Sequence, residues 1–189
     1  LDGRGVPAFV DVFQDATGTA WQTLLALAKG IGATRSGAMH ITFKEETEID
    51  LFIEQFLLPL IIRGIRISFD ELINKGFTPE ALLMELYASG EIGELILKAA
   101  DIGIYRVWEQ NASPTCQFGI YKNSERVLNT EDTKNLINQT LDNIRNGTFV
   151  KSLSDEANSN YKNLHNYNKS NQESLLSRTQ AELKKILKY

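Results

Sequence analysis

The sequence predicts a mainly helical chain that opens with one strand–helix unit. Two observations favour this fold class. From Thr42 onward, apolar residues recur at helical spacing between residues that start or stop helices. Only residues 6–13 form a short apolar, β-branched run typical of a strand. With 189 residues, 42% of them hydrophobic, the chain is long enough to bury a core and has the composition of a globular protein.

Charge and cysteine content exclude several functional classes. A formal net charge of −4 argues against a nucleic-acid binder that relies on a basic face. The single Cys116 has no internal disulfide partner, which fits a reducing cytoplasm. No apolar run reaches the roughly 20 residues that a membrane span needs, and no signal peptide is recognisable. The chain begins with Leu1 rather than Met, as a fragment would. The sequence leaves open whether it is a fragment or a natural stand-alone protein.

The N-terminal unit consists of the strand at residues 6–13, a turn at 14–18 and a helix from Thr19 to Gly30. We expect Trp21 and the apolar residues around it to be core, and Gly30 and Gly32 to end the helix. One such unit cannot bury both faces of its strand. It therefore packs on the rest of this chain, or a preceding part of its domain is missing.

A joint containing glycine and serine follows over residues 34–40, and we place a domain boundary there. Thr42 with Glu45 matches a capping box that opens a long helix. We expect this helix to continue to Ile62, with a kink or break at Pro59.

The rest of the chain is predicted from similar start and stop signals. Thr78 and Pro79 are a typical helix start, whereas Ser89-Gly90 is expected to disturb that helix. We expect helices over 65–74, 78–88, 91–100, 130–146 (capped by Thr130) and 179–187 (with Leu183, Ile186 and Leu187 inward), a loop at 111–119, and an extended or loosely ordered polar stretch at 152–172.

Asp50 and Glu54 are four residues apart, so they share one face of the acidic helix. Like charges so placed repel each other, and a cation between them relieves the repulsion. Paired carboxylate oxygens are the ligands that Mg²⁺ prefers. The alternative is a solvated helix face whose acidic first turn suits the helix dipole. Spacing alone leaves both interpretations open for this pair, whereas Glu45, Glu46 and Glu48 fit the solvated face better.

Several motifs extend over nearly the whole chain in a characteristic order and spacing. The motifs are Gly5-Val6-Pro7, Gln14-Asp15-Ala16-Thr17-Gly18, residues 28–37, Thr42-Phe43-Lys44-Glu45-Glu46-Thr47-Glu48, Asp50-Leu51-Phe52, Gly76-Phe77-Thr78-Pro79-Glu80, residues 113–119 and Ile144-Arg145-Asn146-Gly147-Thr148-Phe149. Together they resemble those of ketol-acid reductoisomerase (acetohydroxy acid isomeroreductase) of the short-chain class.

The resemblance implies a domain organisation and an activity. Residues 1–40 would be the tail of a Rossmann domain whose remainder is absent, and residues 41–189 an all-helical knotted domain for metal binding, substrate binding and dimerisation. Enzymes of this family shift an alkyl group in 2-acetolactate or 2-aceto-2-hydroxybutyrate and reduce the product with NADPH, in branched-chain amino-acid biosynthesis. No Gly-x-Gly-x-x-Gly turn follows a strand here, so NADPH would bind through the missing Rossmann residues. The chain alone would then be inactive.

The resemblance also implies partners. We expect an intertwined homodimer, or a higher assembly of such dimers, that acts on a small-molecule substrate in the cytoplasm, without nucleic acid or membrane. The alternative is a catalytically degenerate homologue that serves as a dimeric assembly or regulatory module.

The family's site holds up to two Mg²⁺ ions between an Asp-x-x-x-Glu pair of one subunit and a Glu-x-x-x-Glu pair of its partner. Asp50 and Glu54 match the first pair, which favours the metal interpretation left open above, with Asp50 the best candidate for a bridging ligand. Glu85 matches the start of the second pair. Its second member falls at Ser89, a poor ligand that Glu91 would replace if the helix bulges there.

Other residues near this site carry further expectations. Ser113 matches the family's substrate-contacting serine. His40 stands where a glutamate is common, and we expect it to be structural or exposed. Cys116 is expected to be a small packed residue, and the apolar run 56–62 to be buried between helices or at a dimer interface.

Overall fold

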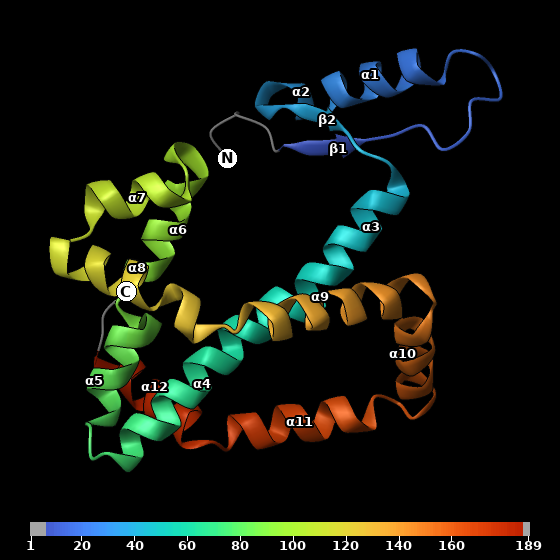
Figure 1. Ribbon diagram of the computed structural model, residues 1–189. Helices are drawn as coiled ribbons and strands as arrows, with labels where there is room; N and C mark the ends of the chain where they lie inside the picture. Colours follow the sequence, from blue (N-terminus) through green and yellow to red (C-terminus); the bar gives the residue numbers. More distant parts are fainter. Residues whose placement is uncertain (1–6, 187–189) are drawn as a thin grey trace. The chain divides into compact units, whose positions relative to one another are not determined.

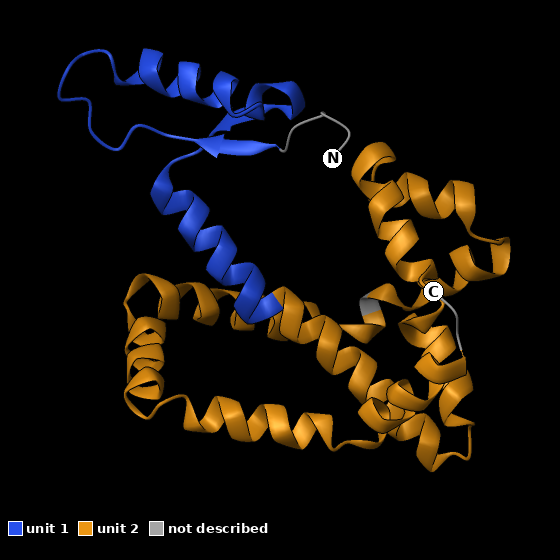
Figure 2. Ribbon diagram, turned by 180° about the vertical axis from the view of Figure 1, so that it is seen from behind, with its two compact units in different colours: residues 1–56 blue, residues 57–189 orange. Residues whose placement is uncertain are grey.

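A computed structural model describes residues 7–186, except for the side chain of Glu125. The chain divides into two compact units, residues 1–56 and residues 57–189, each described by itself (Figure 2). No helix among the described residues is long and apolar enough to cross a membrane. The elements are β1 (Ala8–Val10), α1 (Ala20–Gly30), α2 (Ala33–Ser36), β2 (Ala38–His40), α3 (Phe43–Phe52), η1 (Ile53–Leu57), α4 (Leu58–Asn74), α5 (Pro79–Leu83), η2 (Met84–Ala88), α6 (Glu91–Ile102), α7 (Ile104–Asn111), α8 (Pro114–Val127), α9 (Thr130–Arg145), α10 (Thr148–Asn158), α11 (Lys162–Gln172) and α12 (Leu175–Ile186) (Figure 1).

The mainly helical fold class, with its opening strand–helix unit, is confirmed. The first unit also contains a second strand, because β2 pairs in parallel with β1. The prediction of a plain joint over residues 34–40 is therefore wrong. Ala38-Met39-His40 has no β-branched residue, so only its pairing with β1 identifies it as a strand. The predicted domain boundary after residue 40 stays a prediction.

The two-stranded sheet leaves much apolar surface open. Phe9 and Met39 are cross-strand partners on one face, and they are 59% and 65% exposed. Trp21 on α1 is 38% exposed and Leu27 59% exposed, while Ala28 is buried. The expectation that Trp21 and its neighbours form a core is thus wrong, since two short strands cannot cover the apolar side of an 11-residue helix.

The long acidic helix begins as predicted at Thr42, whose hydroxyl oxygen accepts a hydrogen bond from the Glu45 N–H at 3.1 Å. Residues 43–74 are then helical without interruption, so of the predicted kink or break at Pro59 the break is wrong, while the kink stays a prediction. The π-helical turn η1 comes just before α4, and Pro59 lies in the first turn of α4. Because the helix already runs through η1 into α4, Pro59 removes one backbone hydrogen bond, and the π-helical turn directly before it is the local irregularity that accompanies this loss.

The core of the second unit lies where α4, α5, η2 and α12 pack together. Its buried members are Phe69, Leu82, Leu83, Ala88 and Leu183. Leu183 is inward as predicted, but Ile186 is 72% exposed, so its predicted burial is wrong; Leu187 lies outside the described residues. The stripe of α12 that packs inward contains Thr179 and Leu183.

Two stretches predicted as irregular are helical. The expected loop at 111–119 is mostly the first part of α8, and the expected polar stretch at 152–172 is α10 and α11. The start of α11 is fixed locally, because the Glu156 carboxylate accepts hydrogen bonds from the Leu164 N–H at 2.9 Å and the Asn163 amide at 2.8 Å. Capping hydrogen bonds, rather than burial of aliphatic side chains, support the start of this helix. A composition poor in aliphatic residues therefore did not indicate a helix here.

Two smaller predictions also need correction. Asn129, not Thr130, caps α9, and its side-chain oxygen accepts hydrogen bonds from the N–H groups of Glu131 and Asp132. The run 56–62 is only partly buried in this chain, where Ile61 is 50% and Ile62 61% exposed. A dimer interface over this run stays a prediction.

Candidate functional site

The first predicted carboxylate pair lies at the junction of α3 and η1. Asp50 is in the last turn of α3, Glu54 is in η1, and both are exposed. Phe52 and Phe56 lie two residues further along and stack with ring centroids 5.2 Å apart. An offset of two residues points to the other side of a helix. The segment therefore has an aromatic side and a carboxylate side, and the carboxylates are open to a ligand.

The second predicted pair surrounds the η2 turn. The Ser89 N–H donates to the Met84 carbonyl oxygen at 3.2 Å, a bond between residues five apart that defines a π-helical turn. Residues five apart are thereby stacked, so Ala88 joins Leu83 on the buried side. Glu85 is exposed. The expected irregularity in this helix is therefore present, and it begins ahead of Ser89.

Glu91 follows immediately after this turn. Gly90 has a φ of +82°, which ends the helical path, and Glu91 is the exposed first residue of α6. The hydroxyl oxygen of Ser89 accepts a hydrogen bond from the Glu91 N–H at 3.4 Å. The side chain of Ser89 thus belongs to the junction between the two helices, while the carboxylate of Glu91 faces solvent.

Ser113 lies at the N-terminus of α8. Its hydroxyl oxygen accepts a hydrogen bond from the Cys116 N–H at 3.3 Å. The Gln117 side-chain amide donates to the Ala112 carbonyl at 2.9 Å, which ties this helix start to the segment before it. Cys116 is exposed, so the expectation that it is packed is wrong.

These predicted residues fall in both units. Asp50 and Glu54 are in the first unit, and Glu85, Glu91 and Ser113 are in the second. Within the part of the chain that the structure describes, no three His, Cys, Asp or Glu side chains are grouped closely enough to hold a metal ion. The roles assigned to these residues stay predictions.

Sequence reasoning missed a polar cluster at the carboxyl end of β1. The Asp11 carboxylate accepts hydrogen bonds from the Val12 N–H at 2.9 Å, the Phe43 N–H at 3.0 Å and His40 Nε2 at 3.1 Å. The Phe43 N–H bond, followed by the His40 bond, lowers the pKa of Asp11 against the opposing effect of desolvation. His40 is exposed, as expected, and its ring meets the Trp21 ring edge-on at 5.1 Å. A polar residue directly after a parallel strand is the signal that points to Asp11.

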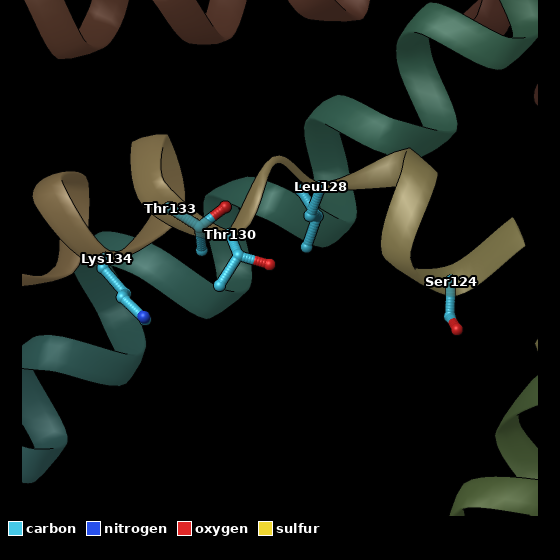
Figure 3. Close-up of a pocket in the computed structure, with 5 residues that line it drawn as sticks. All are labelled: Ser124, Leu128, Thr130, Thr133 and Lys134. Atoms are coloured by element: carbon cyan, nitrogen blue, oxygen red, sulfur yellow. The ribbon is translucent and has the colours of Figure 1, made fainter.

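A separate pocket of about 330 Å³ lies at the junction of α8 and α9 (Figure 3). Lys134 Nζ forms an ion pair with Glu131 at 3.1 Å, and both side chains are largely exposed. None of the predicted site residues is among the described residues that line this pocket, which are Ser124, Leu128, Thr130, Thr133 and Lys134.

Two family models match the chain. Residues 43–189 match the model described as "Ketol-acid reductoisomerase, C-terminal domain", and residues 1–37 match "Acetohydroxy acid isomeroreductase, NADPH-binding domain". Among solved structures, the chain is similar to "Structure of NADH-preferring ketol-acid reductoisomerase from an uncultured archean", with a TM-score of 0.84 and 26% identity. This match covers 96% of the chain and 54% of that structure, so the chain spans about half the length of the protein it resembles.

Proposed function

Because the chain belongs to the ketol-acid reductoisomerase family, we propose that its helical domain holds the metal ions and the substrate of the ketol-acid reductoisomerase reaction. The reaction shifts an alkyl group in 2-acetolactate or 2-aceto-2-hydroxybutyrate and then reduces the product with NADPH. It is a step in the biosynthesis of the branched-chain amino acids. The proposed metal ligands are Asp50, Glu54, Glu85 and Glu91.

One observation carries this proposal. The two π-helical turns in the described part of the chain, η1 and η2, each contain a predicted ligand, Glu54 and Glu85. Well under 1% of residues in globular proteins are π-helical, and such turns occur frequently at functional sites. The spacing and the family motifs point to Glu54 and Glu85 independently of either turn, so the coincidence supports their assignment.

The η2 turn also favours Glu91 over Ser89 as the fourth ligand. In an α-helix the residue above Glu85 is the one four positions on, which is Ser89. Here the N–H of Ser89 donates to the Met84 carbonyl, five positions back, so Ser89 does not lie above Glu85, and the N–H of Gly90 turns back to the Tyr87 carbonyl. The turn thus moves the ligand position toward Glu91, the first carboxylate after Gly90.

The proposed donors fit a hard divalent cation. All four are carboxylates, and all four are exposed on their own units. When bound, Mg²⁺ polarises the ketone oxygen of the substrate and makes the neighbouring hydroxyl more acidic. Ser113 would orient the substrate: its oxygen accepts the Cys116 N–H bond, so its own O–H can donate to a substrate oxygen.

Two further parts of the proposal concern partners. An intertwined homodimer would let the first carboxylate pair of one subunit meet the second pair of the other. Sedimentation that shows a stable monomer at micromolar concentration would contradict this part. NADPH would bind through Rossmann residues beyond these 189. The similar archaeal enzyme is described as preferring NADH, so both nucleotides should be compared once those residues are supplied.

The test is a Mg²⁺ titration by calorimetry on the whole chain. Saturable binding is expected for the wild type, and Asp50→Asn is expected to abolish it because a bridging ligand is lost. Glu91→Gln should weaken binding, whereas Glu94→Gln in the same first turn of α6 should not change it. Absence of binding in the wild type would refute the proposal for this chain.

A second candidate function is favoured by Ser89. The family's second pair has a glutamate at this position, and here the Ser89 side chain is hydrogen-bonded within the helix junction. If Glu91→Gln binds Mg²⁺ as tightly as the wild type, the fourth ligand is lost rather than shifted. The chain would then be a non-catalytic, dimeric homologue, and no turnover should appear even with the Rossmann residues supplied.

A further inference from the structure

The first turn of α3 is attached to the sheet by one side chain. Asp11 follows β1 directly, and its Oδ2 accepts the N–H of Phe43, the first residue of α3. Its Oδ1 accepts hydrogen bonds from Val12 N and His40 Nε2. One carboxylate thus joins the ends of both strands to the start of α3, which carries Asp50 and continues through η1 with Glu54. Figure 1 shows β1 beside β2, and α3 following β2.

Two other contacts lie at this junction between the strand ends and the first turn of α3. The Ile41 N–H donates to the Val10 carbonyl at 3.4 Å, which extends the strand pairing almost to the helix. The Phe13 and Phe43 rings meet edge-on, with centroids 6.5 Å apart. The junction is therefore bonded through Asp11 and the strand pairing, with a largely exposed aromatic pair beside it.

His40 completes the attachment from β2. It is the cross-strand partner of Val10, so its backbone position is fixed by the sheet. The Asp11 carboxylate and Glu46 line one pocket of about 360 Å³ with Phe43, and Lys44 and Glu45 follow directly in the first turn of α3. His40 Nε2 donates to Asp11 at 3.1 Å from the β2 side.

We propose that Asp11 and His40 are positioning residues that set the direction of α3 and so place Asp50 and Glu54 for metal binding. The inference rests on the proposed function of those two carboxylates. Glu54 lies 11 residues after Phe43, about 17 Å along a helix. A tilt of about 5° at the first turn would move Glu54 by about 1.5 Å, whereas metal ligands tolerate about 0.2 Å.

The test compares two carboxylates of the same unit. Asp11 accepts two backbone N–H bonds and one from His40, whereas Asp15 accepts three backbone N–H bonds, from Thr17, Gly18 and Ala20, which hold the turn before α1. Asp11→Ala is expected to weaken Mg²⁺ binding about 10-fold or more, as is usual when a group that orients a ligand is removed. Asp15→Ala should leave Mg²⁺ affinity within about twofold of the wild type, since it does not contact α3.

A pair of His40 substitutions distinguishes positioning from general stability. His40→Leu removes the donor to Asp11 and is expected to lower Mg²⁺ affinity severalfold, while His40→Gln supplies a side-chain amide donor and should restore it. Hydrogen exchange at the Phe43 amide provides a readout that needs no metal. Asp11→Ala should speed that exchange, and Asp15→Ala should not.

Each outcome decides between the two proposals. If Asp11→Ala binds Mg²⁺ like the wild type while Asp50→Asn does not, the positioning role is overturned and the metal site stands. If exchange at Phe43 is the same in Asp11→Ala and the wild type, the attachment itself is overturned. If the wild type binds no Mg²⁺, the metal site is refuted, and with it the positioning of its ligands. If in that case Phe43 exchange is still faster in Asp11→Ala, the attachment of α3 to the sheet is purely structural.

Discussion

Leu83→Ala tests whether the second unit depends on the core around η2. Leu83 is fully buried and packs in the cluster with Phe69, Leu82 and Leu183. The substitution removes three buried carbons at about 0.8 kcal/mol each, and the cavity adds to this loss. We expect a loss of about 3 to 4 kcal/mol in the free energy of unfolding, because the side chain has no exposed fraction to discount.

The two tryptophans allow this loss to be measured in the right unit. Trp21 lies in the first unit and Trp108 in the second. In a Trp21→Phe background, Trp108 fluorescence during urea unfolding therefore reports the second unit. With a slope of about 2 kcal/mol per molar, the urea midpoint should fall by about 1.5 to 2 M.

A control substitution sets the scale. Leu97 on α6 is 76% exposed, and Leu97→Ala should change the free energy of unfolding by less than about 0.5 kcal/mol. A loss below about 1 kcal/mol for Leu83→Ala, or an equal loss for both substitutions, would refute the assignment of this cluster as the core.

Two further predictions concern local capping. The pKa of Glu156 is lowered from 4.5, first because the Leu164 N–H donates to its carboxylate, and despite the opposing effect of desolvation. The stabilisation by this carboxylate is therefore complete above pH 4.5 and is lost as the pH falls through the folded-state pKa. Circular dichroism should show a loss of helix in acid for the wild type and a smaller loss for Glu156→Gln. Asn129→Ala should cost about 1 kcal/mol of thermal or urea stability by removing the cap of α9, while Thr130→Ala should cost much less; the opposite order would restore Thr130 as the cap.

Local signals in the sequence predicted part of the fold. Thr42, Thr78-Pro79 and Gly147 each mark a helix boundary that the structure places at or next to the predicted residue. Such boundaries depend on backbone groups within one turn, so neighbouring residues are enough to identify them. Ser113-Pro114 carries the same kind of start signal, yet the prediction for residues 111–119 is a loop, where the structure has the end of α7 and the start of α8.

Features that depend on distant residues were not predictable in this way. β2 exists through its pairing with β1, and the Asp11–Phe43 hydrogen bond joins residues 32 apart in the sequence. The sequence also indicated only one of the π-helical turns η1 and η2. Ser89-Gly90 indicated an irregularity in the helix at η2, whereas no residue type in 53–57 indicated the π-helical turn η1.

The open face of the small sheet has a practical consequence for handling the protein. Phe9 and Met39 lie side by side there with more than half of each side chain exposed to water. Salts such as sulfate strengthen the association of apolar surface, and a net charge of −4 provides only modest repulsion between molecules. Sulfate and phosphate buffers therefore favour reversible clustering of this chain, and low-salt chloride buffers are the appropriate medium for the metal titrations.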